Sequence, residues 1–133
     1  MSDSNKSLLI YIPCHSDLDL AINQAKKIQS ELKENKKDIN SFISKIEIAI
    51  SINYFEPSKS QLDLAASVSD LIINKSELFL ADANIAHGFM LGHQRNVDFL
   101  WILSANDELL DSGFTKMINS LSDEIDLLVT CVP

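Results

Sequence analysis

The strongest constraint in this sequence is an uninterrupted run of five apolar residues, 99–103, that is followed at once by polar residues. A run of this kind has no amphipathic period, which favours a central strand in a sheet that is covered on both faces. The polar residues that follow it are Ser104, Asn106, Asp107 and Glu108. Open α/β sheets bind their ligands at the carboxyl ends of their strands. The sequence therefore predicts a buried strand that leads into a polar ligand pocket.

Strand and helix signals alternate along the whole chain. Short apolar or alternating runs predict strands at 8–12, 46–53, 78–80, 99–103 and 125–132. Apolar residues at helical spacing predict helices at 18–32, 60–72 and 85–94, and a further helix whose apolar residues run from 114 to 121. Strands joined by helices lie parallel, with right-handed crossovers. We therefore predict an α/β fold of three layers, in which a mostly parallel sheet carries helices on both faces.

The chain length of 133 residues supports a single domain over 1–133, with a flexible start at 1–6. Because the sequence stops just after its last predicted strand, we expect an incomplete domain. Pro13 is expected to end the first strand, and Ser16 with Asp19 has the spacing of a capping box. The other candidate helix caps are Ser58 or Ser60, and Asp111 or Ser112.

Charge and composition restrict the ligands and the compartment. A formal net charge of -8 argues against a nucleic-acid surface, because binding to phosphates needs clustered Lys and Arg. No apolar run approaches the ~20 residues of a membrane span, and the polar start does not resemble a signal peptide. We therefore expect a cytoplasmic protein in which Cys14 and Cys131 are reduced thiols.

Common nucleotide and phosphate motifs are missing. The only glycines are Gly88, Gly92 and Gly113, so neither a dinucleotide-binding turn nor a P-loop can form. A phosphorylation receiver would need paired acids after the first strand and an Asp after the third. The sequence has Pro-Cys-His-Ser-Asp at 13–17 and Ala-Asp-Ala at 81–83. A receiver-like or flavodoxin-like signalling domain is therefore the less favoured alternative.

Several weak motifs together make the chain resemble the inverting family 2 glycosyltransferases of the GT-A fold, in particular their nucleotide-sugar-binding half. The motifs are an apolar strand with Pro and a polar loop (LLIYIPCHSD), an Asn-Ile stretch at 84–86, and a strand that leads into acids (FMLGHQRNVDFLWILSANDEL). Their order and spacing cover nearly all of the chain. The resemblance implies transfer of a sugar from a UDP-, GDP- or dTDP-type donor to an unknown acceptor, with Mg2+ or Mn2+ as the cofactor.

The resemblance also implies where the donor would bind. The Asp-x-Asp element of the family falls on 104–106, so Asn106 and Asp107 would hold the metal ion that neutralises the diphosphate. Asn53, after the second strand, would bind the edge of the base by hydrogen bonding. The complete set of expected donor-binding residues is Pro13, His15, Asp17, Asn53, Asn84, Ser104, Asn106 and Asp107.

Other interpretations remain open. Ser16, Asp17 and Asp107 could serve only as caps of the turns and helices that they precede. An inverting transferase also needs a general base, and no residue of this chain can be nominated for that role. The alternative function is a non-catalytic nucleotide-binding or assembly module of the same fold. A homo-oligomer is compatible with either function.

Overall fold

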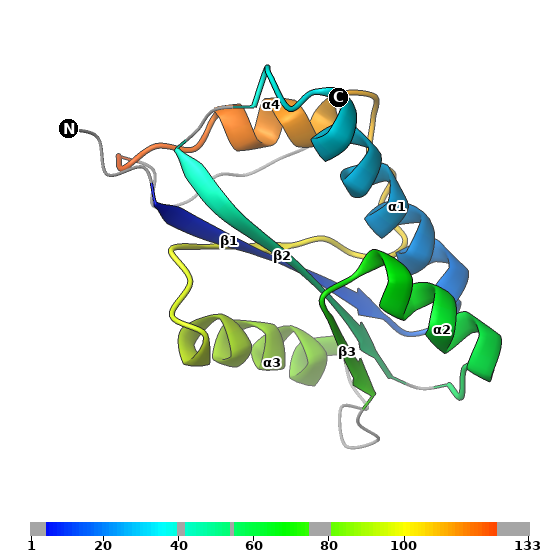
Figure 1. Ribbon diagram of the computed structural model, residues 1–133. Helices are drawn as coiled ribbons and strands as arrows, with labels where there is room; N and C mark the ends of the chain where they lie inside the picture. Colours follow the sequence, from blue (N-terminus) through cyan, green and yellow to red (C-terminus); the bar gives the residue numbers. More distant parts are fainter. Residues whose placement is uncertain (1–4, 40–41, 54, 75–80, 125–133) are drawn as a thin grey trace.

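The computed structural model describes residues 5–39, 42–53, 55–74 and 81–124 (Figure 1). They form a four-stranded parallel sheet with the strand order β3-β2-β1-β4. The strands are β1 (Lys6–Cys14), β2 (Ile43–Ile52), β3 (Leu71–Asn74) and β4 (Phe99–Ile102). The helices are α1 (Leu18–Glu34), α2 (Lys59–Val68), α3 (Ala81–Gln94) and α4 (Gly113–Asn119). The predicted α/β class and the parallel sheet are therefore confirmed.

Helices cover both faces of the sheet. Figure 1 shows α1, α2 and α4 on one face and α3 on the other. Because side chains alternate along a strand, β1 contributes to two cores. Leu8, Ile10 and Ile12 join the larger core with α1, whereas Leu9 and Tyr11 join the smaller core on the side of α3. This arrangement explains why the first strand is apolar without interruption.

The first strand does not end at Pro13 as predicted, because β1 continues to Cys14. Pro13 lies beyond the last residue pair of β1 and β4, which is Tyr11 with Ile102. The N–H that proline lacks would face this side of β1, between the bond from the Leu103 N–H to the Tyr11 carbonyl at 2.9 Å and the bond from the Ala105 N–H to the Pro13 carbonyl at 3.2 Å, so the regular pairing of β1 with β4 ends before Pro13. Residues 1–4 of the flexible start predicted for 1–6 lie outside the described residues, and Lys6 already belongs to β1.

The run at 99–103 forms β4, but its predicted central place in the sheet is not observed. Among the described residues β4 pairs only with β1, and β1 and β2 are the central strands. Apolar residues of β4 nevertheless pack on both sides of the sheet. Phe99 and Trp101 contact the larger core, whereas Leu100 and Ile102 contact the smaller one. Because β4 contacts a core on each face of the sheet, its side chains can all be apolar although β4 is not a central strand.

The second helix is shorter than predicted. α2 ends at Val68, and Leu71 and Ile72 belong to β3 instead of to the predicted helix 60–72. Asp70 explains the change, because it bonds twice to Ile48 of β2. The Asp70 N–H donates to the Ile48 carbonyl at 2.8 Å, and the Ile48 N–H donates to Asp70 Oδ2 at 2.8 Å. The strands predicted at 78–80 and 125–132 lie outside the described residues.

Two of the predicted helix caps need correction. α1 is capped by Asp17, whose carboxylate accepts from the Asp19 N–H at 2.9 Å, so Ser16 does not form the expected capping box. The helix begins one residue later than the capping-box spacing required. Ser112 occupies the cap position of α4 without a side-chain cap bond. The cap of α2 is Ser58, which forms a complete capping box with Gln61.

Candidate functional site

The carboxyl ends of β1, β2 and β4 are joined at one end of the sheet, which we call the carboxyl edge. The Asn53 N–H, directly after β2, donates to the Cys14 carbonyl of β1 at 2.9 Å. On the other side of β1, the Ala105 N–H donates to the Pro13 carbonyl at 3.2 Å. The loop after β1, Asn53 and the segment after β4 are therefore brought together, as the sequence predicted for a site at strand ends.

The strand order also reverses beside this edge. The chain runs outward from β1 through β2 to β3, and then crosses by α3 to place β4 on the other side of β1. In open α/β sheets such a reversal is the usual location of a ligand crevice. The strand order and the backbone hydrogen bonds thus indicate the same location for a ligand site, at the carboxyl ends of β1 and β4.

The predicted site residues divide into an exposed group and a buried pair. His15, Asp17, Asn106 and Asp107 are exposed, and Pro13 and Ser104 are partly buried. Asn53 and Asn84 are buried, with exposed fractions of 3% and 1%. The exposed group can meet a ligand directly, whereas the buried pair forms part of the interior at the same end of the sheet.

Asn84, on α3, is the centre of a buried polar cluster beneath the edge. Its Oδ1 accepts from the Tyr11 hydroxyl and the Ser51 hydroxyl, both at 2.6 Å. Its Nδ2 donates to Asn53 Oδ1 at 3.1 Å and to the Ser51 carbonyl at 3.4 Å. Asn84 therefore links the ends of β1 and β2 to α3.

Tyr11, Ser51 and His87 were not expected to take part. The Tyr11 hydroxyl lies 3.3 Å from His87 Nδ1. Burial raises the pKa of Tyr11 from 10.0 to about 12, against the smaller opposing effect of a hydrogen bond with Ser51. A tyrosine in an otherwise aliphatic strand was the available signal, because a buried phenol needs a hydrogen-bond partner.

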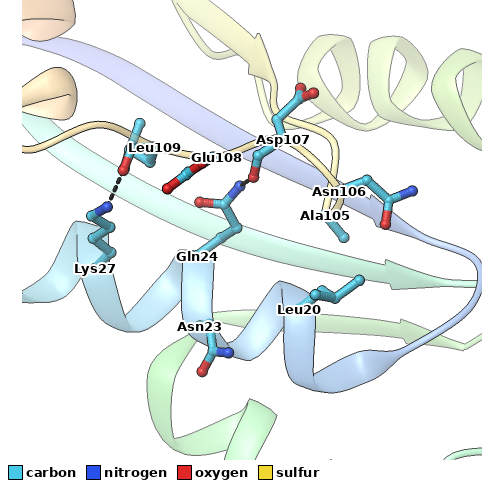
Figure 2. A pocket seen from close by; sticks show the side chains of 9 residues that line it. All are labelled: Leu20, Asn23, Gln24, Lys27, Ala105, Asn106, Asp107, Glu108 and Leu109. Atoms are coloured by element: carbon cyan, nitrogen blue, oxygen red, sulfur yellow. Dashed lines mark hydrogen bonds between the residues drawn. The ribbon is translucent and has the colours of Figure 1, made fainter.

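The segment after β4 is held against α1 by its backbone carbonyls. Gln24 donates to the Asp107 carbonyl and to the Ser104 carbonyl, and Lys27 donates to the Leu109 carbonyl. Figure 2 shows an open pocket between this segment and α1. The Asp107 carboxylate points away from α1, so it is free to meet a ligand outside this pocket.

A metal site built only by the protein is not evident in the described part of the chain, where no three His, Cys, Asp or Glu residues come together. The expected ligands Asn106 and Asp107 lie in a turn. The Asp107 N–H donates to the Ser104 carbonyl at 3.1 Å, and the Asn106 N–H donates to Ser104 Oγ at 3.3 Å. Asp107 can thus offer one exposed carboxylate to a cation.

Cys14 has a structural role at this edge. It is buried, its Sγ donates to the Asp17 carbonyl at 3.1 Å, and burial raises the pKa of its thiol. Cys131 lies outside the described residues. A neutral, enclosed thiol is a poor nucleophile, so these contacts favour a structural role for Cys14.

Comparison with known proteins gives no match to a family model, a curated protein or a solved structure. None of the helices in the described part of the chain is long and apolar enough to cross a membrane.

Proposed function

We propose that this chain binds a nucleotide-sugar donor at the carboxyl edge of β1, β2 and β4, as the donor-binding half of a glycosyltransferase. The observation that carries the proposal is the joining of Pro13, Cys14, Asn53 and Ala105 by backbone hydrogen bonds at the point of strand reversal. This geometry supports a ligand that extends from Asn53 across β1 to Asp107. A base, a ribose and a diphosphate have the polar groups that such an edge can bind.

In this arrangement the base lies toward Asn53 and the diphosphate toward Asp107. His15 and Asp17 are exposed in the loop after β1, the strand that lies between β2 and β4 in the sheet, and they supply polar groups for the ribose. The Asp17 carboxylate already caps α1 through Oδ1, so its remaining oxygen is the one available to a hydroxyl. The overall charge of -8 opposes binding of a diphosphate without a cation.

A divalent cation fits the exposed residues at 106 and 107. Mg2+ is commonly bound by one or two carboxylates together with substrate phosphates and water. Asp107 would supply the carboxylate and Asn106 a carbonyl oxygen, and the cation would neutralise charge on the departing diphosphate. The proposal therefore requires that the metal and the nucleotide bind together.

A second candidate is a non-catalytic nucleotide-binding module with the same site. It needs only the joined strand ends, whereas an inverting transferase needs a general base in addition. The signalling-domain alternative loses support from the strand order. Flavodoxin-like sheets have the order 2-1-3, whereas β3 here pairs with β2.

Calorimetric titration with UDP, with and without Mn2+, tests the proposal. We expect Mn2+ to tighten binding, and Asp107→Ala to abolish this gain by removing the carboxylate. Asp111→Ala removes the same charge farther along the same loop and should retain the gain. Absence of nucleotide binding with and without metal would overturn the proposed donor site. If both variants lost the Mn2+-dependent gain in affinity equally, the role of Asp107 would be overturned.

A further inference from the structure

One buried polar atom at the proposed base site has no partner among the residues that the structure describes. Asn53 Nδ2 is enclosed and has no hydrogen-bond acceptor among the described residues, although Oδ1 of the same amide is bonded to Asn84. Leaving a buried donor unpaired is unfavourable. An unpaired amide N–H at a predicted ligand edge therefore indicates a missing acceptor that a ligand can provide.

The orientation of this amide is fixed by its neighbours. The Ser51 carbonyl can only accept, so the Asn84 atom that faces it at 3.4 Å must be the amide nitrogen. Asn84 Oδ1 then accepts from the hydroxyls of Tyr11 and Ser51. The Asn84 nitrogen in turn requires an oxygen opposite it on Asn53. The Asn53 amide cannot rotate by half a turn without placing two N–H groups against each other.

An amide held in one orientation distinguishes two kinds of base edge. Uracil, thymine and guanine carry a ring N–H beside a carbonyl, and we call this the lactam edge. Cytosine and adenine carry a bare ring nitrogen beside an amino group, which we call the amidine edge. An Asn amide whose N–H is available and whose oxygen keeps a second lone pair can bond to the lactam edge with both atoms. The amidine edge needs the opposite orientation.

We propose that Asn53 selects nucleotides with a lactam edge, and that Asn84, Ser51 and Tyr11 set this selectivity by fixing its amide orientation. The inference rests on the proposed nucleotide site and adds the residues that select the base. Asn53 contacts the base, whereas the other three are positioning residues. Because Asn53 is 3% exposed, side chains at the edge must rotate to admit the base, a change that is common on binding.

The first test compares UDP and GDP with CDP and ADP by calorimetry in the presence of Mn2+. We expect the two lactam nucleotides to bind at least ~10-fold more tightly, because a mismatched edge leaves buried polar groups unpaired. Equal affinities, or a preference for CDP and ADP, would overturn the selectivity while leaving the nucleotide site intact. No binding by any of the four would overturn both.

The second test reverses the orientation with Asn84→Asp. The new carboxylate loses the bond to the Ser51 carbonyl but accepts from both hydroxyls and from Asn53 Nδ2, so the Asn53 amide turns and the preference shifts toward CDP and ADP. Asn96→Asp is the matched control, because Asn96 is exposed at the opposite edge of the sheet, before β4. It should keep the original preference. An unchanged preference in a folded Asn84→Asp protein would overturn the positioning role.

A third variant keeps the test open if Asn84→Asp does not fold. Asn53→Asp has nearly the same shape and still offers an oxygen to Asn84, but it has no N–H for the carbonyl of a lactam edge. Each edge can then form one bond with the carboxylate, so the ratio of UDP to CDP affinity should fall toward one. A ratio equal to that of the unmodified chain would show that the Asn53 amide does not read the base.

Discussion

Gly88 lies against the ring of Tyr11 with no room for a side chain. A Cβ at this position would be 2.7 Å from Tyr11 Cδ2. Tyr11 is fully buried and bonded to Asn84, so its ring cannot move aside without breaking the polar cluster. Gly88→Ala should therefore lower the free energy of unfolding by about 1–3 kcal/mol through overpacking, as measured by urea denaturation.

Gly92→Ala is the control for this prediction. It lies on the same helix, and a Cβ there would make ordinary contacts with Val97 Cγ2 at 3.4 Å and with the two Leu100 methyl groups at 3.7 Å. Alanine is favoured over glycine in a helix by about 1 kcal/mol, so this variant should be neutral or more stable. Equal destabilisation by both substitutions would show that the contact with Tyr11 is not the cause.

Tyr11 also predicts how stability depends on alkaline pH. Its pKa is raised by burial from 10.0 to about 12, so the folded state favours the neutral phenol. The resulting stabilisation is complete below pH 10, the unfolded pKa, and is lost as the pH rises toward the folded value near 12. The free energy of unfolding, measured by denaturation across this pH window, should fall less in Tyr11→Phe than in the unmodified chain. Identical pH profiles would contradict the assignment.

The start of α1 shows what residue patterns reveal about elements and what they leave open. Apolar spacing located this helix and the face that it buries, because both depend on the helical repeat alone. The cap was assigned one residue too early, since Ser16 and Asp17 have equally suitable side chains. Likewise, the boundary between α2 and β3 depends on the pairing of Asp70 with Ile48, a contact between distant residues that no local pattern encodes.

The corrected cap gives a prediction at the scale of this element. Asp17→Ala should lower the free energy of unfolding by about 1 kcal/mol, because the Asp19 N–H loses its acceptor. Ser16→Ala should change it by less than about 0.5 kcal/mol, as for an ordinary surface substitution. Thermal and urea unfolding of the two variants measure the difference, and a larger effect of Ser16→Ala would contradict the observed cap.

At the scale of the whole molecule, alternating strands and helices sufficed to predict the class, the parallel sheet and the edge that gathers polar residues. The run at 99–103 predicts a central strand, but among the described residues β4 pairs only with β1, because an apolar run indicates burial on both faces of a sheet and not the number of neighbouring strands. The buried cluster escaped prediction for a related reason. Tyr11, Ser51 and Asn84 meet only after α3 crosses to the other face of the sheet.

The account depends most on the claim that a nucleoside diphosphate binds at the carboxyl edge between β1, β2 and β4. Backbone amide chemical shifts, followed by NMR while UDP and Mg2+ are added, test both binding and location. The account predicts the largest changes at Cys14, Asn53 and Ala105, and little change at Asn96 on the opposite edge. No change on addition of UDP and Mg2+, or changes concentrated around Asn96 and α4, would contradict it.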